Sequence, residues 1–533
     1  MCKRLKVFNV ITTLIMSLSV LTAGAIEQSD KENTQLKKRP NILWIYIEDQ
    51  NNWNNAYGDF TVDTPTIKNF ADTGVRFNNT MQPAPVCSAT RSALVTGKYQ
   101  TTLGVHEHRS NRSSYNGIFL PKGYKTVPEL FIDAGYKTFN IGKDDYNFKY
   151  DRSKIYNAHK GKVGFQGAHD GEKFNWAHDL SNQPFFGQIQ LKGGKHHKFN
   201  ADIPPVKSID ITLPPYYPDT PGYRKSWAKH YQTQVMSDIE LKDILVNLEA
   251  NGILDNTIIF WFSDHGMELL RHKQALYEDS VKVPFIVNWP AGNKLLRQKG
   301  AVRNELISGL DIPATSLALA GIEIPDYYDG KNLFADSFKG RDFVISAKDR
   351  MDFTFDRGRT VRTENYRYIK NFHPEIPRSQ PQYRDKIDFS IEGRALFEQG
   401  KLNEVQRRYY APTKPAEELY DLKKDPHQIN NLASNKAYSK ELIKHREILM
   451  NWIKQTDDKG QYPESETAIK ETLDLWGKSC VSQACNNYRK KHPRTYNKPG
   501  DKIYPPLEWP SYLPKPKGSY YDELEDVYRA KFQ

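Results

Sequence analysis

Short apolar segments alternate with amphipathic helical segments through most of this chain of 533 residues. The segment from Asn41 to Ile47 is a continuous apolar run, which is typical of a strand buried on both faces. Strands that alternate with helices predict an α/β fold with a large, mostly parallel central sheet, and active sites in such sheets lie beyond the carboxyl ends of the strands. Further predicted strands are Thr138 to Ile141, Phe185 to Leu191, Thr257 to Phe262 and Val283 to Asn288, and predicted helices are Thr64 to Gly74, Lys225 to Asn251 and Asp311 to Ala320.

The pattern changes near Val361, where we place a domain boundary. We expect a catalytic domain over 40–360 and a smaller α+β domain over 361–480, because two strand-like segments, Tyr366 to Phe372 and Leu419 to Leu422, precede a helical one, Lys440 to Lys454. Residues 481–533 are rich in proline and predict an extended tail, and the polar segment 26–39 predicts a disordered lead-in.

The first 25 residues have the pattern of a secretory signal peptide. A basic end with Lys3, Arg4 and Lys6 precedes an apolar core from Val10 to Leu21, and Ala23-Gly24-Ala25 is an A-x-A cleavage sequence. We therefore expect a periplasmic or secreted protein after cleavage near Ala25. The later sequence contains no segment typical of a membrane span, so we expect no stable membrane insertion.

The charge of the chain favours a polyanionic partner. The formal net charge is +12, and removing the signal takes away three positive and no negative charges, which leaves +9. Nucleic acid is disfavoured because there is no recognition motif and no dense Lys/Arg block in the body of the chain. The 31 Tyr, 25 Phe and 9 Trp suit stacking on sugars, but they also suit an ordinary core with polar rims.

The four cysteines predict different roles. Cys2 leaves with the signal peptide. Cys480 and Cys485 are five residues apart in a chain that we expect to be exported, so a disulfide between them is the natural pairing. Cys87 remains as the cysteine with a candidate chemical role.

Carboxylates follow two of the predicted strands. Glu48-Asp49 ends the first strand, and Ser263-Asp264-His265-Gly266 ends the strand that begins at Thr257. Such residues also occur as solvated turns or as helix N-caps. Their recurrence at the same end of two strands instead favours a metal, and a hard cation such as Ca²⁺ prefers carboxylate oxygens. A dication there would polarise the oxygens of an anionic substrate.

Cys87 stands at the start of a predicted helix. Pro83 and Pro85 hold the preceding chain extended, the segment Ser88 to Val95 is helical in pattern, and Gly97 provides the C-cap. Residue 87 is therefore expected at a helix N-terminus, where free N–H groups and the macrodipole favour anions. A buried structural cysteine is the alternative interpretation.

The run from Cys87 to Gly97, CSATRSALVTG, resembles the defining motif of the type I sulfatases, C-[ST]-[AP]-x-R followed by T-G. The resemblance extends from about residue 40 to residue 460. It implies the alkaline-phosphatase-like fold and oxidation of Cys87 to formylglycine by a formylglycine-generating or anaerobic maturation enzyme. In that family a hydroxyl of the hydrated aldehyde attacks sulfur, the bond to the alcohol breaks, and the second hydroxyl expels sulfate.

The resemblance also implies roles for individual residues. Lys143 and Lys273 contact the sulfate, and Arg91, one helical turn after Cys87, either steadies the modified side chain or holds the metal-ligating carboxylates apart. The family usually has Asp where this chain has Glu48, and His where it has Asp145, so we expect Asp145 or another His to handle the proton. His196 is our candidate for the acid that protonates the leaving alcohol. The metal ligands that the resemblance implies are Glu48, Asp49, the modified Cys87, Asp264 and His265.

A polar loop after the nucleophile helix carries four residues that could recognise the rest of an anionic sugar, or that could form only a solvated basic loop. These residues are His106, His108, Arg109 and Arg112. We therefore expect an exported sulfatase that acts on a sulfated polysaccharide or oligosaccharide. A phosphate or phosphonate ester hydrolase of the same superfamily and a non-catalytic relative that binds sulfated glycans are the alternatives.

Overall fold

A computed structural model describes residues 39–462, apart from some segments within that range. Those segments are 111–117, 159–179, 181–182, 197–198, 200–202, 293–298, 352–355, 381, 383 and 385–386. The predicted signal peptide, the lead-in before residue 39, the tail, Arg112, Cys480 and Cys485 therefore lie outside the described residues, and the disulfide stays a prediction.

A seven-stranded sheet forms the centre of the molecule, in the order β3-β4-β1-β5-β6-β2-β7. β1 pairs with β4 and with β5 in parallel, so that Ile47 lies between Leu191 and Ser263. Only β6 runs against the other strands of this sheet. The strands are β1 (Asn41–Ile47), β2 (Val75–Met81), β3 (Lys137–Ile141), β4 (Phe185–Leu191), β5 (Thr257–Ser263), β6 (Lys282–Asn288) and β7 (Ala301–Ser308).

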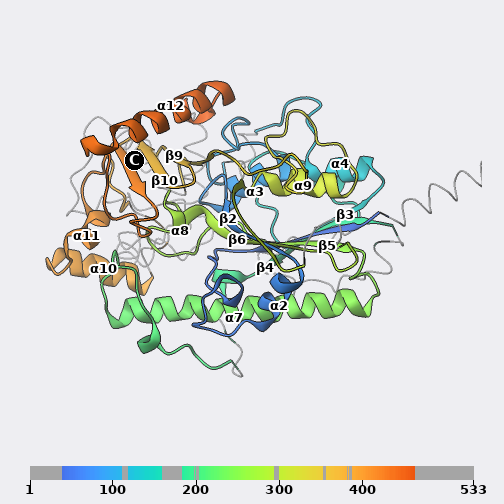
Figure 1. The fold of residues 1–533 in the computed structure, drawn as a ribbon, viewed down its shortest axis with the longest axis horizontal. Helices are drawn as coiled ribbons and strands as arrows, with labels where there is room; N and C mark the ends of the chain where they lie inside the picture. The colour runs from blue at the N-terminus through green and yellow to red at the C-terminus, as the bar shows by residue number, and fades with distance from the viewer. Residues whose placement is uncertain are drawn as a thin grey trace, which may run out of the picture.

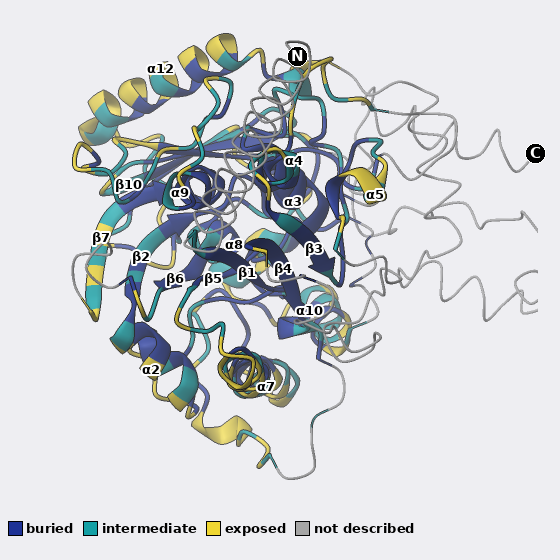
Figure 2. Cartoon of the chain, turned by 90° about the vertical axis from the view of Figure 1, so that its right-hand side faces the viewer, coloured by how far each residue is buried: buried dark blue, intermediate teal, exposed yellow. Residues whose placement is uncertain are grey.

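Helices cover both faces of this sheet, as Figure 1 shows. Alternate residues of β1 enter opposite cores, because successive strand side chains point to opposite faces. Trp44 joins a core with α4 and α9, whereas Ile45 joins a core with α2 and α7. The main helices of this part are α2 (Pro65–Thr73), α3 (Cys87–Thr96), α4 (Val127–Asp133), α7 (Pro221–Ala250), α8 (Glu278–Val281) and α9 (Asp311–Leu319). The central strands β1, β4 and β5 are buried along their whole length and dark in Figure 2, while α7 keeps an exposed outer face.

A second, antiparallel sheet has the order β11-β10-β9-β8. Its strands are β8 (Val344–Lys348), β9 (Gly358–Arg362), β10 (Tyr366–Asn371) and β11 (Glu417–Asp421), and α12 (Ser439–Thr456) packs on it. The helix α10 (Asp388–Glu398) contacts α7, and the short helix α11 (Glu404–Arg407) follows it along the chain. Within the described residues, no helix has both the length and the apolar character of a bilayer crossing.

The predicted α/β fold with a mostly parallel sheet is confirmed. The predicted strands, helices and the Gly97 cap are present, with Gly97 at φ 67°. Four strands were not predicted, namely β2, β7, β8 and β9. Two strands of the small sheet, β8 and β9, begin before residue 361. This sheet therefore contains residues from both sides of the predicted domain boundary.

Candidate active site

The ends of β1 and β5 and the start of α3 meet at one edge of the large sheet. The backbone N–H of Asp49 donates to Asp264 Oδ1 at 3.1 Å, which ties the two strand ends together. Cys87 is the first residue of α3 and is 1% exposed. Its side chain therefore lies at a helix N-terminus, where the local dipole favours negative charge.

Four buried side chains bring their ligand atoms together here. One ligand atom from each of Asp49, Cys87, Asp264 and His265 lies within 4.8 Å of the others. Cys87 Sγ is 3.1 Å from His265 Nε2 and 3.9 Å from Asp49 Oδ1. This geometry contains four of the five predicted metal ligands.

The ring of His265 is oriented by its own loop. His265 Nδ1 lies 2.8 Å from the carbonyl oxygen of Gly266, and a carbonyl can only accept, so Nδ1 carries the proton. The Nε2 atom then faces the cluster, 3.3 Å from Asp49 Oδ1 and 3.6 Å from Asp264 Oδ1. When a dication is bound, this orientation offers it the Nε2 lone pair.

Glu48 has a different environment from the other predicted ligands. Its Oε1 accepts from Arg91 Nη2 at 2.9 Å and from Lys143 Nζ at 3.1 Å, and its Oε2 lies 3.1 Å from Lys195 Nζ. Burial opposes ionisation, but Lys143, Lys195 and Arg91 hold the pKa of Glu48 well below its ordinary value. Its charge is thus shared among three cations. Arg91 also contacts Asp264 and lies 4.5 Å from the centre of the Tyr46 ring.

Lys273 completes the arrangement on the other side of Cys87. Its Nζ lies 3.0 Å from both carboxylate oxygens of Asp49 and 3.5 Å from Cys87 Sγ. Burial would raise the pKa of the Cys87 thiol, but Lys143 and Lys273 outweigh burial and lower it. Because thiolate is the reactive form of cysteine, the site favours chemistry at this sulfur.

Asp145 connects the site to the polar loop. Its Oδ2 lies 2.9 Å from Lys143 Nζ, and its Oδ1 lies 3.5 Å from Arg109 Nε. Arg109 is also fixed through its backbone N–H, which donates to Ser88 Oγ at 3.0 Å. Around the cluster, five cations, Arg91, Arg109, Lys143, Lys195 and Lys273, face four carboxylates, Glu48, Asp49, Asp145 and Asp264.

Both predicted sugar-binding histidines, His106 and His108, are buried. His106 forms a second group with Glu107 and Asp349, whose ligand atoms also lie within 4.8 Å of one another. The backbone N–H of His108 donates to the carbonyl of Arg350 at 3.1 Å. Arg109 joins the polar loop to the site through Asp145.

The turn after β4 brings Lys195 into the site, which the sequence did not lead us to predict. His196, our candidate acid, places its Nε2 3.2 Å from Glu240 Oε1 of α7. The turn depends on Gly193, at φ 50°, where a Cβ would lie 2.2 Å from the carbonyl oxygen of Glu48. Gly194 is equally tight against Asp49. Two consecutive glycines just after a predicted strand are the sequence feature that could have indicated this close approach between the turn and the backbone of Glu48 and Asp49.

Comparisons with known proteins agree with this geometry. The family model described as "Sulfatase" matches residues 40–322. An ulvan-active sulfatase of Formosa agariphila is 30% identical over 521 residues, covering 89% of this chain and 86% of that protein. The solved structure of a 2-O GAG sulfatase has a TM-score of 0.56 at 21% identity, covering 80% of this chain and 94% of that one. A phosphonate monoester hydrolase of Agrobacterium radiobacter has a TM-score of 0.53 at 16% identity, covering 78% and 96%.

Proposed function

This chain belongs to the sulfatase family, whose members hydrolyse sulfuric esters, and from that premise we propose that it removes sulfate from a carbohydrate at the site around Cys87. One observation carries the proposal. Cys87 Sγ is buried at the N-terminus of α3, between the Asp49–Asp264–His265 cluster and Lys273. A nucleophile, a cation site and a sulfate-binding cation thus share one small space.

Two groups absent from the polypeptide itself fit this site. Oxidation of Cys87 to formylglycine supplies a hydrated aldehyde as the nucleophile, and a divalent cation such as Ca²⁺ supplies positive charge for the sulfate oxygens. Asp49, Asp264 and His265 offer the cation two carboxylates and an imidazole lone pair. Carboxylates suit Ca²⁺, and the imidazole makes the donor set mixed.

The remaining side chains orient the reacting groups. Lys143 and Lys273 are buried cations whose charges act on residue 87, and they would bind the sulfate oxygens. Arg91 contacts Glu48 and Asp264 together, so it positions the carboxylates and does not need to touch substrate. Asp145, held by Lys143 and Arg109, is our candidate to take up the proton that the family's usual histidine would accept.

The proposal further includes a carbohydrate substrate and export of the protein from the cytoplasm. The Formosa relative is named as active on ulvan and the structural neighbour as a GAG sulfatase, and both are sulfated polysaccharides. The predicted signal peptide with its cleavage sequence near Ala25 supports a periplasmic or secreted location. Conversion of Cys87 requires a formylglycine-generating or anaerobic maturation enzyme as a partner.

The alternative function is hydrolysis of phosphate or phosphonate esters with the same residues. Its support is the phosphonate monoester hydrolase among the structural neighbours, which shows that the fold is compatible with that reaction. Initial rates with 4-nitrophenyl sulfate, 4-nitrophenyl phosphate and phenyl phosphonate esters separate the two. Faster turnover of the phosphorus esters would replace the sulfatase assignment.

The test of the nucleophile combines mass and kinetics. Active protein should contain a peptide around residue 87 whose mass corresponds to replacement of –CH₂SH by –CHO. The Cys87→Ala variant should lose at least about 10⁴-fold in kcat, since it removes the covalent nucleophile. Ser92→Ala, on the same helix, is the matched control. An unmodified thiol in fully active protein would refute the proposal.

A non-catalytic glycan-binding protein is the other alternative. Such a protein would bind sulfated oligosaccharide without any turnover, even after Cys87 is shown to be converted.

A further inference from the structure

A cavity of about 490 Å³ lies beside the candidate active site, within the size range of ligand sites. Three parts of the chain line it. These are the approach to α7 with Tyr216 and Tyr217, the segment from Leu270 to Tyr277, and the C-terminal segments with Tyr410 and Asn430. Its lining does not include Cys87, Asp49 or Asp264, so the cavity is distinct from the metal cluster.

The cavity is nevertheless close to the reacting groups. Arg271 lines it, and Lys273, two residues along the chain, places its Nζ 3.0 Å from Asp49. Two residues span at most about 7 Å of chain. A smaller cavity lined by Lys273 also shares Arg271, Tyr277, Arg378, Tyr409 and Glu418 with the large one. The two cavities therefore share part of their walls, and Lys273 lines the smaller one.

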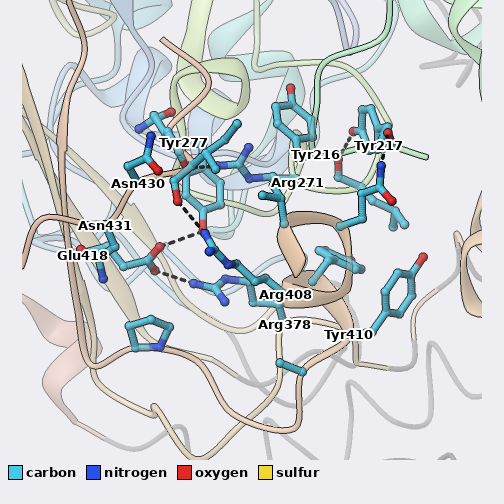
Figure 3. Close-up of a pocket in the computed structure, with 18 of the residues that line it drawn as sticks. Tyr216, Tyr217, Arg271, Tyr277, Arg378, Arg408, Tyr410, Glu418, Asn430 and Asn431 are labelled. Carbon is cyan, nitrogen blue, oxygen red and sulfur yellow. Dashed lines mark hydrogen bonds and ion pairs between the residues drawn. The ribbon is translucent and has the colours of Figure 1, made fainter. Parts of the chain in front are cut away.

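The charges in the lining favour an anion. Three guanidinium groups, those of Arg271, Arg378 and Arg408, face one carboxylate, that of Glu418. Glu418 already accepts hydrogen bonds from Arg378, Tyr277, Tyr420 and Asn371, so its charge is fully compensated. Figure 3 shows the three arginines grouped at the middle of the cavity, with Glu418, Asn430 and Asn431 on one side and the rings of Tyr216, Tyr217 and Tyr410 on the other.

The walls are preorganised. The Arg271 guanidinium carbon lies 4.2 Å from the ring centre of Tyr216 and 4.0 Å from that of Tyr277, and its nitrogens donate to the carbonyls of His427 and Gln428. Arg408 is half exposed and donates to the carbonyl of Ile429 and to the exposed Glu404. Rigid aromatic walls lower the entropic cost of binding, and their faces suit the C–H surfaces of a sugar ring.

We propose that this cavity binds an anionic sugar residue of the same glycan chain whose sulfate ester is cleaved at Cys87. The inference rests on the proposed function and extends it, because it makes the enzyme specific for oligosaccharides that carry a second negative charge. The anion is a carboxylate or a second sulfate, both of which guanidinium groups bind in a bidentate manner. Binding energy gained here would contribute to cleavage at the remote ester.

Arg408→Gln is the main test, because Arg408 is exposed and its loss leaves no buried carboxylate unpaired. Arg407→Gln, at an exposed neighbour outside the lining, removes the same charge and serves as the control. We expect Arg408→Gln to lower kcat/KM for a sulfated oligosaccharide roughly tenfold relative to kcat/KM for 4-nitrophenyl sulfate. Ala411→Trp, which puts a ring into the cavity, should have the same selective effect.

Calorimetry separates this inference from the proposed function. In the Cys87→Ala background, ulvan-derived and glycosaminoglycan-derived oligosaccharides are titrated into the Arg408 and Arg407 variants. A roughly tenfold weaker affinity for Arg408→Gln alone supports the cavity even if no substrate is hydrolysed. Equal behaviour of the two variants in both kinetics and calorimetry would overturn it.

Two chemical treatments of the best-bound oligosaccharide identify the anion. If desulfation removes the difference between the variants, the cavity binds sulfate, and if carboxyl reduction removes it, the cavity binds a uronate. A difference that survives both treatments would show that the bound residue is uncharged and would contradict the inference.

Discussion

Lys195 Nζ and Glu48 Oε2 are 3.1 Å apart, while Arg91 and Lys143 donate to the other oxygen of the same carboxylate. The same ammonium group lies 3.8 Å from Asp49 Oδ2. Glu48 differs from the Asp that sulfatases usually have at this position, and Lys195 directly precedes His196, our candidate acid. The departure at Glu48 is therefore accompanied by a contact with a lysine that was not predicted in the site.

Removal of Lys195 should impair catalysis. Lys195→Met leaves one oxygen of a buried carboxylate without its cation, and that charge would then repel the sulfate that must approach. We expect kcat/KM for 4-nitrophenyl sulfate to fall by roughly 10- to 100-fold, which corresponds to about 1.4–3 kcal/mol. Lys207→Met, at an exposed position, is the control. Wild-type kinetics for Lys195→Met would show that the pair has no part in the reaction.

His196 should be a structural residue if its contact with Glu240 defines its role. His196→Asn would leave the buried carboxylate of Glu240 without this partner, so the free energy of unfolding should fall by about 1–3 kcal/mol. Turnover of aryl sulfate per folded molecule should persist. Denaturant unfolding and kinetics on the same preparation check both points. A large fall in kcat with unchanged stability would instead support the role of His196 as the acid.

Metal removal should be visible without any substrate. Exhaustive dialysis against a chelator should lower the melting temperature, and Ca²⁺ should restore it, since a ligand at 100 times its Kd stabilises a fold by about 2.7 kcal/mol. Asp264→Asn removes one converging carboxylate and should abolish this response. Asp326→Asn, at an exposed site, should retain it. A response to Ca²⁺ that is equal in both variants would place the cation elsewhere.

Glu278 should make the fold sensitive to acid. Burial opposes its ionisation, but Arg367 and Arg362 lower its pKa from the ordinary 4.5 to about 2. A lowered pKa in the folded state stabilises the fold above about pH 4.5, and this contribution is lost as the pH falls towards 2. The shift corresponds to roughly 3 kcal/mol.

Stability curves between pH 6 and pH 3 test this assignment. Glu278→Gln should be less stable than the parent at pH 6, and the difference should shrink at low pH. Glu249→Gln, on the exposed face of α7, should follow the parent. An acid response of Glu278→Gln identical to that of the parent would assign the sensitivity to other carboxylates.

The sequence was most informative where a strand is buried on both faces. β1 and β5 are continuous apolar runs, so their ends, and with them Asp49 and Asp264, were predictable. β2 and β7 were missed because they mix polar and apolar residues near the edge of the sheet, where half of each strand is only partly buried. β8 belongs to the small sheet but precedes the change in pattern near Val361.

The site was predictable as a set of motifs and not as a set of contacts. The pairing of Glu48 with three cations depends on how β1, β3, α3 and the turn at Gly193 are brought together, and no local pattern encodes that. The choice between Lys195 and His196 depends on which side chain the 3₁₀ turn Gly193–Lys195 points towards Glu48. A shift of that turn by one residue would point His196 towards Glu48 in place of Lys195.

All ten residues of α3 are buried, and the helix is held by the cores on either side of it. A modifying enzyme could not reach the Cys87 side chain in this fold, because that residue is almost fully buried. On the proposed mechanism, Cys87 must be converted while the nascent polypeptide is still open, so the order of events in the cell is oxidation first and tertiary structure afterwards. A chain that folds too early would be locked permanently in an unreactive form.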